Sequence, residues 1–156
     1  MRVPFAAALL FAVALPAFAQ PAEMPKTHAS PADVAAAMAK GKAAARMTPQ
    51  PLVSVGPYHA MLEYRAQPTP ASVHENEDEL INVIGGSGSF VLGGTLKDQT
   101  RRNATNLSGS GITGGKTYTM EKGSYFFVPA GTAHYFASVG PEGLTLMTLH
   151  VPHIAK

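Results

Sequence analysis

From residue 52 onward, the sequence is a succession of short runs of β-type residues separated by glycine, proline and asparagine. The runs cover residues 52–55, 58–65, 80–84, 89–92, 116–120, 124–128, 133–139 and 144–151. No helical period interrupts them, and glycine-rich pieces between them supply the turns and corners that a closed sheet needs. This pattern is typical of an antiparallel all-β sandwich or barrel. We therefore expect one all-β domain over residues 52–151.

A single helix is expected before the strands, over residues 30–48. Ser30 is a typical N-cap, Pro31 suits the first turn, and Asp33 lies near the positive end of the helix dipole. The apolar stripe of this segment is thin, so we expect the helix to pack on the surface of the β domain and to carry no chemistry. The polar residues 20–29 before it are expected to form a flexible lead-in.

The first 19 residues have the pattern of a secretory signal peptide. Arg2 supplies one early positive charge, residues 3–15 are uncharged and apolar, and Ala17 and Ala19 frame a small-residue cleavage site. An uncleaved membrane anchor is the alternative, but the apolar run is shorter than a spanning helix requires. We expect cleavage after Ala19 and a periplasmic or secreted mature chain.

Charge and cysteine content restrict the partners of the mature chain. Of 156 residues, 12 are Lys or Arg and 10 are Asp or Glu, and removing the first 19 residues takes away only Arg2 among them. The near-neutral remainder gives no reason to expect nucleic acid or an anionic membrane surface as a partner. The chain has no cysteine, so a metal site must use histidine, carboxylate and other oxygen ligands.

Residues 95–115 form the longest stretch without a clear β pattern, and they are dense in Asn, Ser, Thr and Gly. A connection of this length in a compact domain is usually a functional loop or a disordered one. Arg101 and Arg102 lie within it and are candidates to hold a substrate carboxylate. A solvated basic loop is the alternative interpretation.

Residues 74–79 combine one histidine and four carboxylates directly before an apolar strand. A solvated acidic turn is the simpler interpretation of such a run. However, Glu79 opens the strand itself, and a glycine-rich turn follows. A carboxylate on a rigid β element is suitably placed for a metal or for catalysis.

The second notable segment, residues 123–138, runs from a strand through a Pro-x-Gly turn into the next strand. Its spacing resembles the second motif of the cupins, which is matched at Gly123, Pro129, Gly131 and His134. It departs from that motif at Ser138, where the cupins have asparagine.

The first cupin motif is matched less completely. His74, Glu79 and Gly86 correspond to its second histidine, its glutamate and its closing glycine. Ser72 stands where the first histidine belongs, and Ala66 stands in place of the opening glycine. The two motifs occur in the expected order, and the resemblance extends over residues 52–150. The chain is thus similar to a small exported bacterial single-domain cupin.

The resemblance implies a cupin double-stranded β-helix, a jelly-roll-like barrel, with the short N-terminal helix added. Carried over residue by residue, it implies His74, Glu79 and His134 as ligands of one divalent metal ion, with a fourth ligand missing at Ser72. Such a set resembles the facial triad that binds Fe(II), and Zn, Mn or Ni would also accept it. The missing ligand also leaves open a site too weak to stay occupied. The family further implies a homodimer.

His150 is a candidate catalytic residue or fourth ligand. It lies on the last expected strand in register with Leu144 and Thr148, and it would face the barrel interior if they do. A hydrogen-bonded strand residue is the alternative. His28 and His153 lie near the chain ends and are expected to have no function.

Weaker candidates lie on other strands. His59 is a distant candidate ligand, and Asn76 could offer an amide oxygen. Tyr64, Tyr125 and Phe127 are candidates to line the cavity, although core packing is the simpler role for each.

Fold alone leaves function open, because one fold hosts many activities. The first hypothesis is a metal-dependent enzyme, a dioxygenase or related oxidoreductase acting on a small organic molecule. The second is a non-catalytic periplasmic protein that binds a small ligand or the metal itself. A metal-dependent isomerase or lyase is the third.

Overall fold

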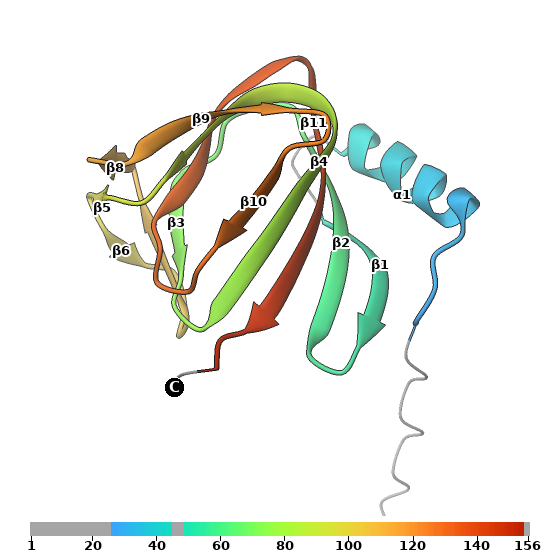
Figure 1. Ribbon diagram of the computed structural model, residues 1–156, viewed down its shortest axis with the longest axis horizontal. Coiled ribbons are helices and arrows are strands. Elements are labelled where there is room, and N and C mark those ends of the chain that lie inside the picture. Colours follow the sequence, from blue (N-terminus) through green and yellow to red (C-terminus); the bar gives the residue numbers. More distant parts are fainter. Residues whose placement is uncertain (1–25, 45–48, 155–156) are drawn as a thin grey trace, which may run out of the picture.

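The computed structural model describes residues 26–44 and 49–154. Within these ranges the chain forms one helix and eleven strands (Figure 1). The elements are α1 (Pro31–Ala43), β1 (Gln50–Val55), β2 (Tyr58–Arg65), β3 (Ala71–His74), β4 (Glu77–Leu92), β5 (Thr95–Lys97), β6 (Thr100–Arg101), β7 (Asn106–Gly109), β8 (Gly111–Thr113), β9 (Lys116–Glu121), β10 (Tyr125–Val128) and β11 (His134–Pro152). The expected all-β architecture with a short N-terminal helix is confirmed. The predicted signal peptide and residues 20–25 of the lead-in lie outside the described residues.

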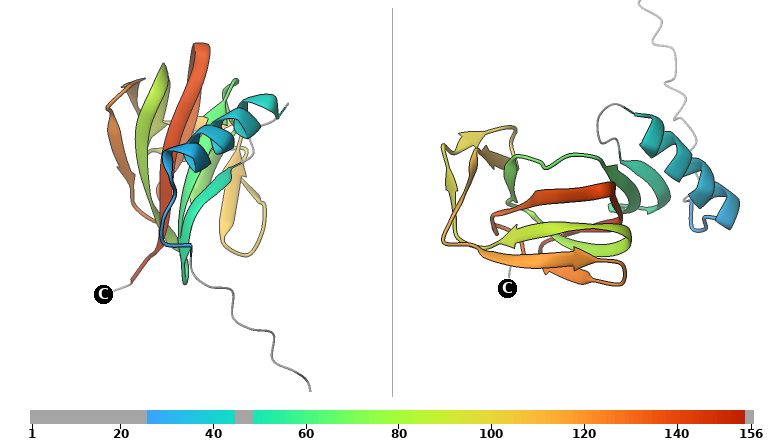
Figure 2. Two further views of the ribbon diagram at one scale, coloured as in Figure 1. Left: turned by 90° about the vertical axis from the view of Figure 1, so that its right-hand side faces the viewer. Right: turned by 90° about the horizontal axis from the view of Figure 1, so that it is seen from above.

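The long strands β4 and β11 form the centre of the sheet. They pair antiparallel from His134 opposite Leu92 to Pro152 opposite Glu77. On its other edge, β4 pairs with β10 near its start and with β9 near its end. On its other edge, β11 pairs with β3 at its start and with β2 along its second half. From β3 the sheet continues through β7 to β6, while β1 extends it beyond β2. The strands thus curl into a barrel-like roll (Figure 2).

β4 and β11 are each one strand where the sequence pattern predicts two. Their pairing continues through register shifts, one of them between Val139 and Leu144. At this shift Gly86 has φ +77°, and a Cβ there would overlap the carbonyl oxygen of Gly143. The glycines therefore allow a bulge and a bend in a continuous ribbon. The prediction of separate strands was wrong because bulge glycines and turn glycines look alike in sequence.

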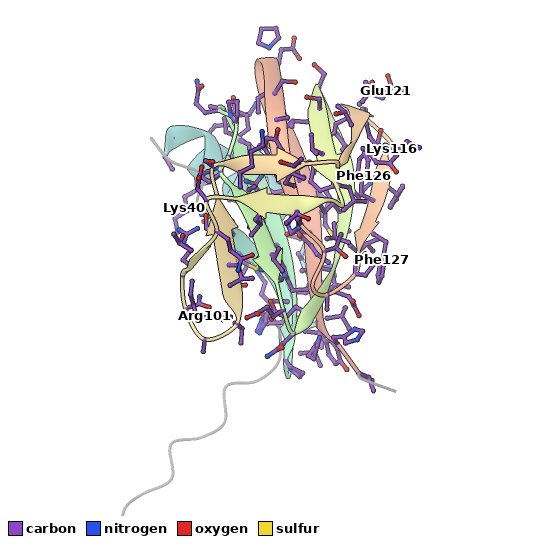
Figure 3. All side chains as sticks on the ribbon, turned by 90° about the vertical axis from the view of Figure 1, so that its left-hand side faces the viewer. Lys40, Arg101, Lys116, Glu121, Phe126 and Phe127 are labelled. Carbon is purple, nitrogen blue, oxygen red and sulfur yellow. The ribbon has the colours of Figure 1, made fainter. Side chains whose placement is uncertain are left out.

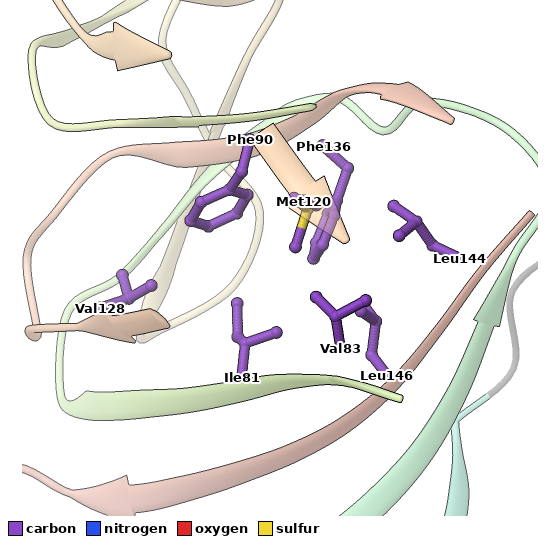
Figure 4. Packing of buried hydrophobic residues seen from close by; sticks show 8 residues of the cluster. All are labelled: Ile81, Val83, Phe90, Met120, Val128, Phe136, Leu144 and Leu146. Atoms are coloured by element: carbon purple, nitrogen blue, oxygen red, sulfur yellow. The ribbon is translucent and has the colours of Figure 1, made fainter. Parts of the chain in front are cut away.

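The main apolar core fills the roll between β4, β9, β10 and β11 (Figure 4). Alternate residues of β4 and β11 point inward, as the period of a half-buried strand requires. The core consists of Ile81, Val83, Phe90, Met120, Val128, Phe136, Leu144 and Leu146.

The segment 95–115 is ordered into four short strands, so its prediction as an irregular loop was wrong. β5 pairs with β8, and β7 pairs with both β3 and β6. Leu96, Leu107 and Ile112 belong to a second apolar cluster with Ala71 and Ala133. Backbone pairing and these few apolar residues order a segment whose composition is mostly polar.

The helix α1 lies outside the barrel against β1 and β2 (Figures 1 and 2). Ser30 is its N-cap, as predicted, and the structure shows that it also forms a capping box with Asp33. Gly41 is buried against Tyr64 of β2. The helix ends at Ala43, whereas the predicted end at residue 48 lies outside the described residues. No described helix has the length and apolar character needed to cross a membrane.

Candidate metal centre

His74, Glu79 and His134 meet inside the barrel, with one potential ligand atom from each within 4.8 Å of the others. The Nε2 atom of His134 lies 3.4 Å from Oε2 of Glu79, and Nε2 of His74 lies 4.0 Å from the same oxygen. Glu79 is 4% exposed and His134 is 3% exposed. The structure therefore brings together the three residues that the two motif segments single out.

The curl of the β4–β11 ribbon explains this convergence. His134 begins β11 and pairs with Leu92 at the far end of β4, whereas Glu79 lies near the start of β4 and pairs with His150. Because the ribbon closes on itself, the side chain of His134 nevertheless reaches Glu79. His74 ends β3, the strand that also pairs with the start of β11.

The turn before β11 is fixed to the segment that carries His74. Gly131 donates its backbone N–H to the carbonyl oxygen of His74 at 2.8 Å, and Ala130 donates its N–H to Oδ1 of Asp78 at 2.7 Å. Gly131 has φ +75°, a conformation that glycine adopts without strain. The two motif segments therefore hold each other in place.

In the triad of His74, Glu79 and His134, both imidazoles are oriented through their Nδ1 atoms. Nδ1 of His74 lies 2.6 Å from Oδ1 of Asn106, and Nδ1 of His134 lies 3.0 Å from the carbonyl oxygen of Thr132. Both oxygens are acceptors, so each Nδ1 carries the proton and donates it. The Nε2 lone pairs are then left to face Glu79, which is the tautomer that a metal-binding histidine needs.

The pKa values of His74 and Glu79 are both shifted toward the forms that bind a metal ion. Burial lowers the pKa of His74 below its usual range, although the hydrogen bond with Asn106 acts against this. Burial alone would raise the pKa of Glu79, but its contact with His134 and the nearby imidazoles of His150 and His74 lower it below its usual range. A neutral imidazole and an ionised carboxylate are the forms that bind a divalent cation.

Ser72 and His150 flank the triad. The hydroxyl of Ser72 lies 3.4 Å from Nε2 of His134, at the position where the cupin motif has its first histidine. His150 approaches from the other side, with Nε2 3.6 Å from Oε1 of Glu79 and its ring centroid 5.1 Å from that of His74. His150 therefore faces the carboxylate oxygen that the two triad histidines do not approach.

Other predicted candidates lie away from the triad. His59 is exposed and its Nδ1 lies 3.1 Å from the hydroxyl oxygen of Ser54. Asn76 is exposed, and its backbone carbonyl oxygen accepts the backbone N–H of His153. His28 is exposed.

Of the three aromatic candidates, one lines the cavity. Tyr64 does so, but Tyr125 is 67% exposed and Phe127 is 57% exposed. Phe127 points away from the barrel (Figure 3), because odd-numbered residues of β10 face outward. For Tyr125 and Phe127, both the cavity role and the core role were wrong.

A cavity of about 730 Å³ adjoins the triad and opens to solvent. Arg102 lines it, whereas Arg101 binds Glu75 through two hydrogen bonds of 2.7 and 3.1 Å. The structure adds Glu63 and Arg65, two buried charged residues of β2 that the motifs do not single out. Their spacing of two residues within one strand was the available signal, since it places both on one face.

Solved structures with the same architecture include two dioxygenases. Hydroquinone 1,2-dioxygenase PnpCD, in complex with Cd²⁺ and 4-hydroxybenzonitrile, is 13% identical, with a TM-score of 0.56 over 75% of this chain and 71% of that chain. Hydroquinone 1,2-dioxygenase from Sphingomonas sp. TTNP3, with 4-hydroxybenzoate bound, is also 13% identical, with a TM-score of 0.56 over 76% of this chain and 73% of that one.

A conserved Klebsiella pneumoniae protein with a double-stranded β-helix domain is 14% identical, with a TM-score of 0.50 over 72% of this chain and 82% of that one. This chain has the cupin fold. No protein-family model matches the sequence, and no curated protein matches it. At these identities the likeness to the cupins is one of fold, so the chemistry must be argued from the site.

Proposed function

We propose that this cupin binds one divalent metal ion through His74, Glu79 and His134 and acts on a small organic molecule in the adjoining cavity. The observation that carries the proposal is the arrangement of the two imidazoles. Each is held at Nδ1 by a backbone or amide oxygen, so that its Nε2 points at the buried carboxylate of Glu79. Ligand histidines typically donate their other ring N–H to an oxygen in this way, which fixes the tautomer and the orientation of the ring.

The donor set fits Fe(II), since two imidazoles and one carboxylate form the facial triad of non-haem iron oxygenases. Zn, Mn and Ni accept the same ligands. Bound Fe(II) supplies oxygen chemistry at its open positions. We therefore place the activity among the dioxygenases and related oxidoreductases. The two dioxygenases of the same fold support this choice by analogy of fold.

The protein's own residues supply position and environment. The cavity holds the substrate beside the triad, and Phe136 forms part of its apolar wall. His150 contacts the second oxygen of Glu79, and we propose that it positions this carboxylate. The ring of Phe90 packs 5.9 Å from the ring of His134 and limits the movement of that imidazole.

Ser72 favours a second candidate function, a non-catalytic protein that binds a metal or a small ligand. With serine in place of a fourth ligand, the cation would be held by three residues and would exchange more readily. The two functions differ in turnover. An enzyme consumes O2 with a substrate, while a binding protein retains its ligand unchanged.

Elemental analysis of the purified chain beside a His134→Ala variant tests the proposal. We expect about one Fe, Mn, Zn or Ni per chain in the parent and a loss of at least roughly tenfold in the variant. A His153→Ala variant is the matched control, because His153 is exposed and contacts Asp78 outside the triad. Equal metal content in all three proteins would contradict the proposed site. Oxygen uptake by the iron-loaded protein with hydroquinone and related phenols then tests the hypothesis that the protein is a dioxygenase.

We further propose that the mature chain begins after Ala19 and works in the periplasm or outside the cell, as a homodimer. The signal-peptide pattern of residues 1–19 supports export. N-terminal sequencing of protein from a periplasmic fraction is expected to begin at Gln20. Light scattering of the purified chain measures its oligomeric state.

A further inference from the structure

A buried ion pair lies in the same cavity as the candidate metal centre. Glu63 and Arg65 of β2 are 4% and 7% exposed, and NH2 of Arg65 lies 2.6 Å from Oε2 of Glu63. Both residues line the cavity together with His74, Glu79 and His134. The wall of the cavity therefore contains the candidate metal centre in one part and a guanidinium in another.

The two members of the ion pair differ in how fully they are paired. Glu63 accepts from Arg65 at Oε2 and from the hydroxyl of Thr148 at Oε1, 3.0 Å away. Arg65 makes one hydrogen bond among the described residues, and its buried Nε has no partner there. A guanidinium has five N–H donors, so Arg65 retains most of its capacity to donate.

The guanidinium is also held in a fixed position. Its central carbon lies 3.9 Å from the ring centroid of Phe136, which places the planar group over an aromatic face. Glu63 fixes one end of that plane. A guanidinium restrained in this way loses little entropy when it binds a planar carboxylate.

A contribution to folding stability does not by itself explain why Glu63 and Arg65 form a buried ion pair. Removing two charges from water costs several kcal/mol for each ion, and a buried pair is often no more stabilising than apolar residues of the same volume. A buried arginine with unused donors beside a cavity is therefore better explained by a ligand that completes its hydrogen bonds.

We propose that Arg65 binds the anionic group of the substrate, and that this chain acts on a small organic acid. The carboxylate lies on Arg65, and the reactive part of the molecule faces His74, Glu79 and His134. This inference deepens the proposed function, on which its account of the reactive end rests. The anion site itself requires no metal.

The two arginines of segment 95–115 are less suited to this role. Arg101 is not part of the cavity lining, and its guanidinium already donates two hydrogen bonds to Glu75 and one each to the backbone oxygens of Asn103 and Ala104. Arg102 lines the cavity but is exposed, so solvent screens its charge. A buried guanidinium interacts more strongly with a ligand charge than an exposed one does.

Binding of matched acids and amides to the metal-free chain tests the proposal. The probes are acetate, benzoate and succinate, each beside its uncharged amide, and calorimetry measures their affinities after chelation has removed any metal. We expect at least one acid to bind roughly 10- to 100-fold more tightly than its amide, as a hydrogen-bonded charge pair implies. Amides that bind as tightly as all three acids would overturn the proposal.

Two variants change the charge of the pair in opposite directions. Arg65→Gln is expected to abolish the preference for the acid. Glu63→Gln leaves Arg65 without its counter-charge and is expected to increase that preference severalfold. A purely structural ion pair predicts no such opposite effects, because both substitutions would only reduce stability. Unchanged preference in Arg65→Gln, or a reduced preference in folded Glu63→Gln, would overturn the proposal.

Metal analysis of the same proteins separates the two proposals. If the His134→Ala variant loses its metal but still prefers the acid to the amide, both assignments are supported. Metal binding without any preference for the acid refutes the role of Arg65 alone. A preference for the acid in a chain that binds no metal refutes the proposed metal centre alone.

Discussion

Asn106 accepts a hydrogen bond from His74 across the pairing of β7 with β3, with 2.6 Å between Oδ1 and Nδ1. This contact fixes both the tautomer and the orientation of a candidate metal ligand. It comes from a segment whose composition indicates an irregular loop. β7 is therefore part of the site, because it supplies the acceptor that leaves Nε2 of His74 free for a metal.

Replacing Asn106 with alanine is expected to weaken metal binding by about 10- to 100-fold, since loss of the oxygen that orients a ligand histidine typically has this effect. Competition with a chelator of known affinity measures the change. Asn103→Ala is the control, because Asn103 accepts from Thr105 within the β6–β7 turn. Equal affinities for the two variants would show that Asn106 does not orient a ligand.

His150 is predicted to position Glu79 and not to bind the metal. We expect His150→Ala to retain the metal with about tenfold lower affinity, and His150→Gln to recover part of the loss through its amide. His59→Ala is the matched control, because His59 pairs with His150 across β2 and β11 but is exposed. If His150→Ala lost the metal as completely as His134→Ala, His150 would instead be a fourth ligand.

The triad could be predicted from sequence because the resemblance to the two cupin motifs implies its three members. Two of them also lie at locally recognisable positions, since His134 begins a strand shortly after a Pro-x-Gly turn and Glu79 begins an apolar run. His150 could be placed only conditionally, since its direction depends on the register of β11 with β4. The structure settles that register by pairing His150 with Glu79.

Glu63, Arg65 and Asn106 could not be found in the same way. A charged residue in a strand faces the core or solvent according to the parity of its neighbours, and β2 has Leu62 and Glu63 both buried. This ambiguity arises because α1 covers the outer face of β2, so that alternation of polar and apolar residues no longer distinguishes the two faces. Asn106 could not be placed for another reason, since Asn and Gly, which are frequent in this segment, are depleted in strands generally.

The lowered pKa of His74 predicts a dependence of stability on pH. The folded state disfavours the charged imidazole, so below about pH 6.5, the ordinary histidine pKa, the unfolded chain takes up more protons than the folded one. The free energy of unfolding of the metal-free chain should therefore decrease as the pH falls through this window. Urea unfolding at several pH values measures it.

A His74→Gln variant should show a flatter decrease over the same window, because glutamine does not titrate. His28→Gln is the control for general charge effects, as His28 is exposed. Identical pH profiles for the parent and His74→Gln would exclude His74 as the cause. Metal affinity should decrease over the same range, since protons compete with the cation for Nε2.

Replacing Phe90 and replacing Phe127 with alanine are expected to have very different effects on the free energy of unfolding. Phe90 is fully buried and packs against Phe126 and Phe136 at 5.1 Å between ring centroids. Phe90→Ala should cost about 3–5 kcal/mol, because it removes a large apolar group and leaves a cavity. Phe127→Ala, on the outer face of β10, should change the free energy of unfolding by less than about 1 kcal/mol.

Urea unfolding of both variants at one pH measures these differences. Because Phe90 also packs against the ring of His134, Phe90→Ala is expected to weaken metal binding as well, while Phe127→Ala leaves it unchanged. A large loss of stability in Phe127→Ala would mean that the outer face of β10 is covered in solution, as a dimer interface on that face would require. The concentration dependence of unfolding distinguishes that case, since only an associating chain becomes more stable as its concentration rises.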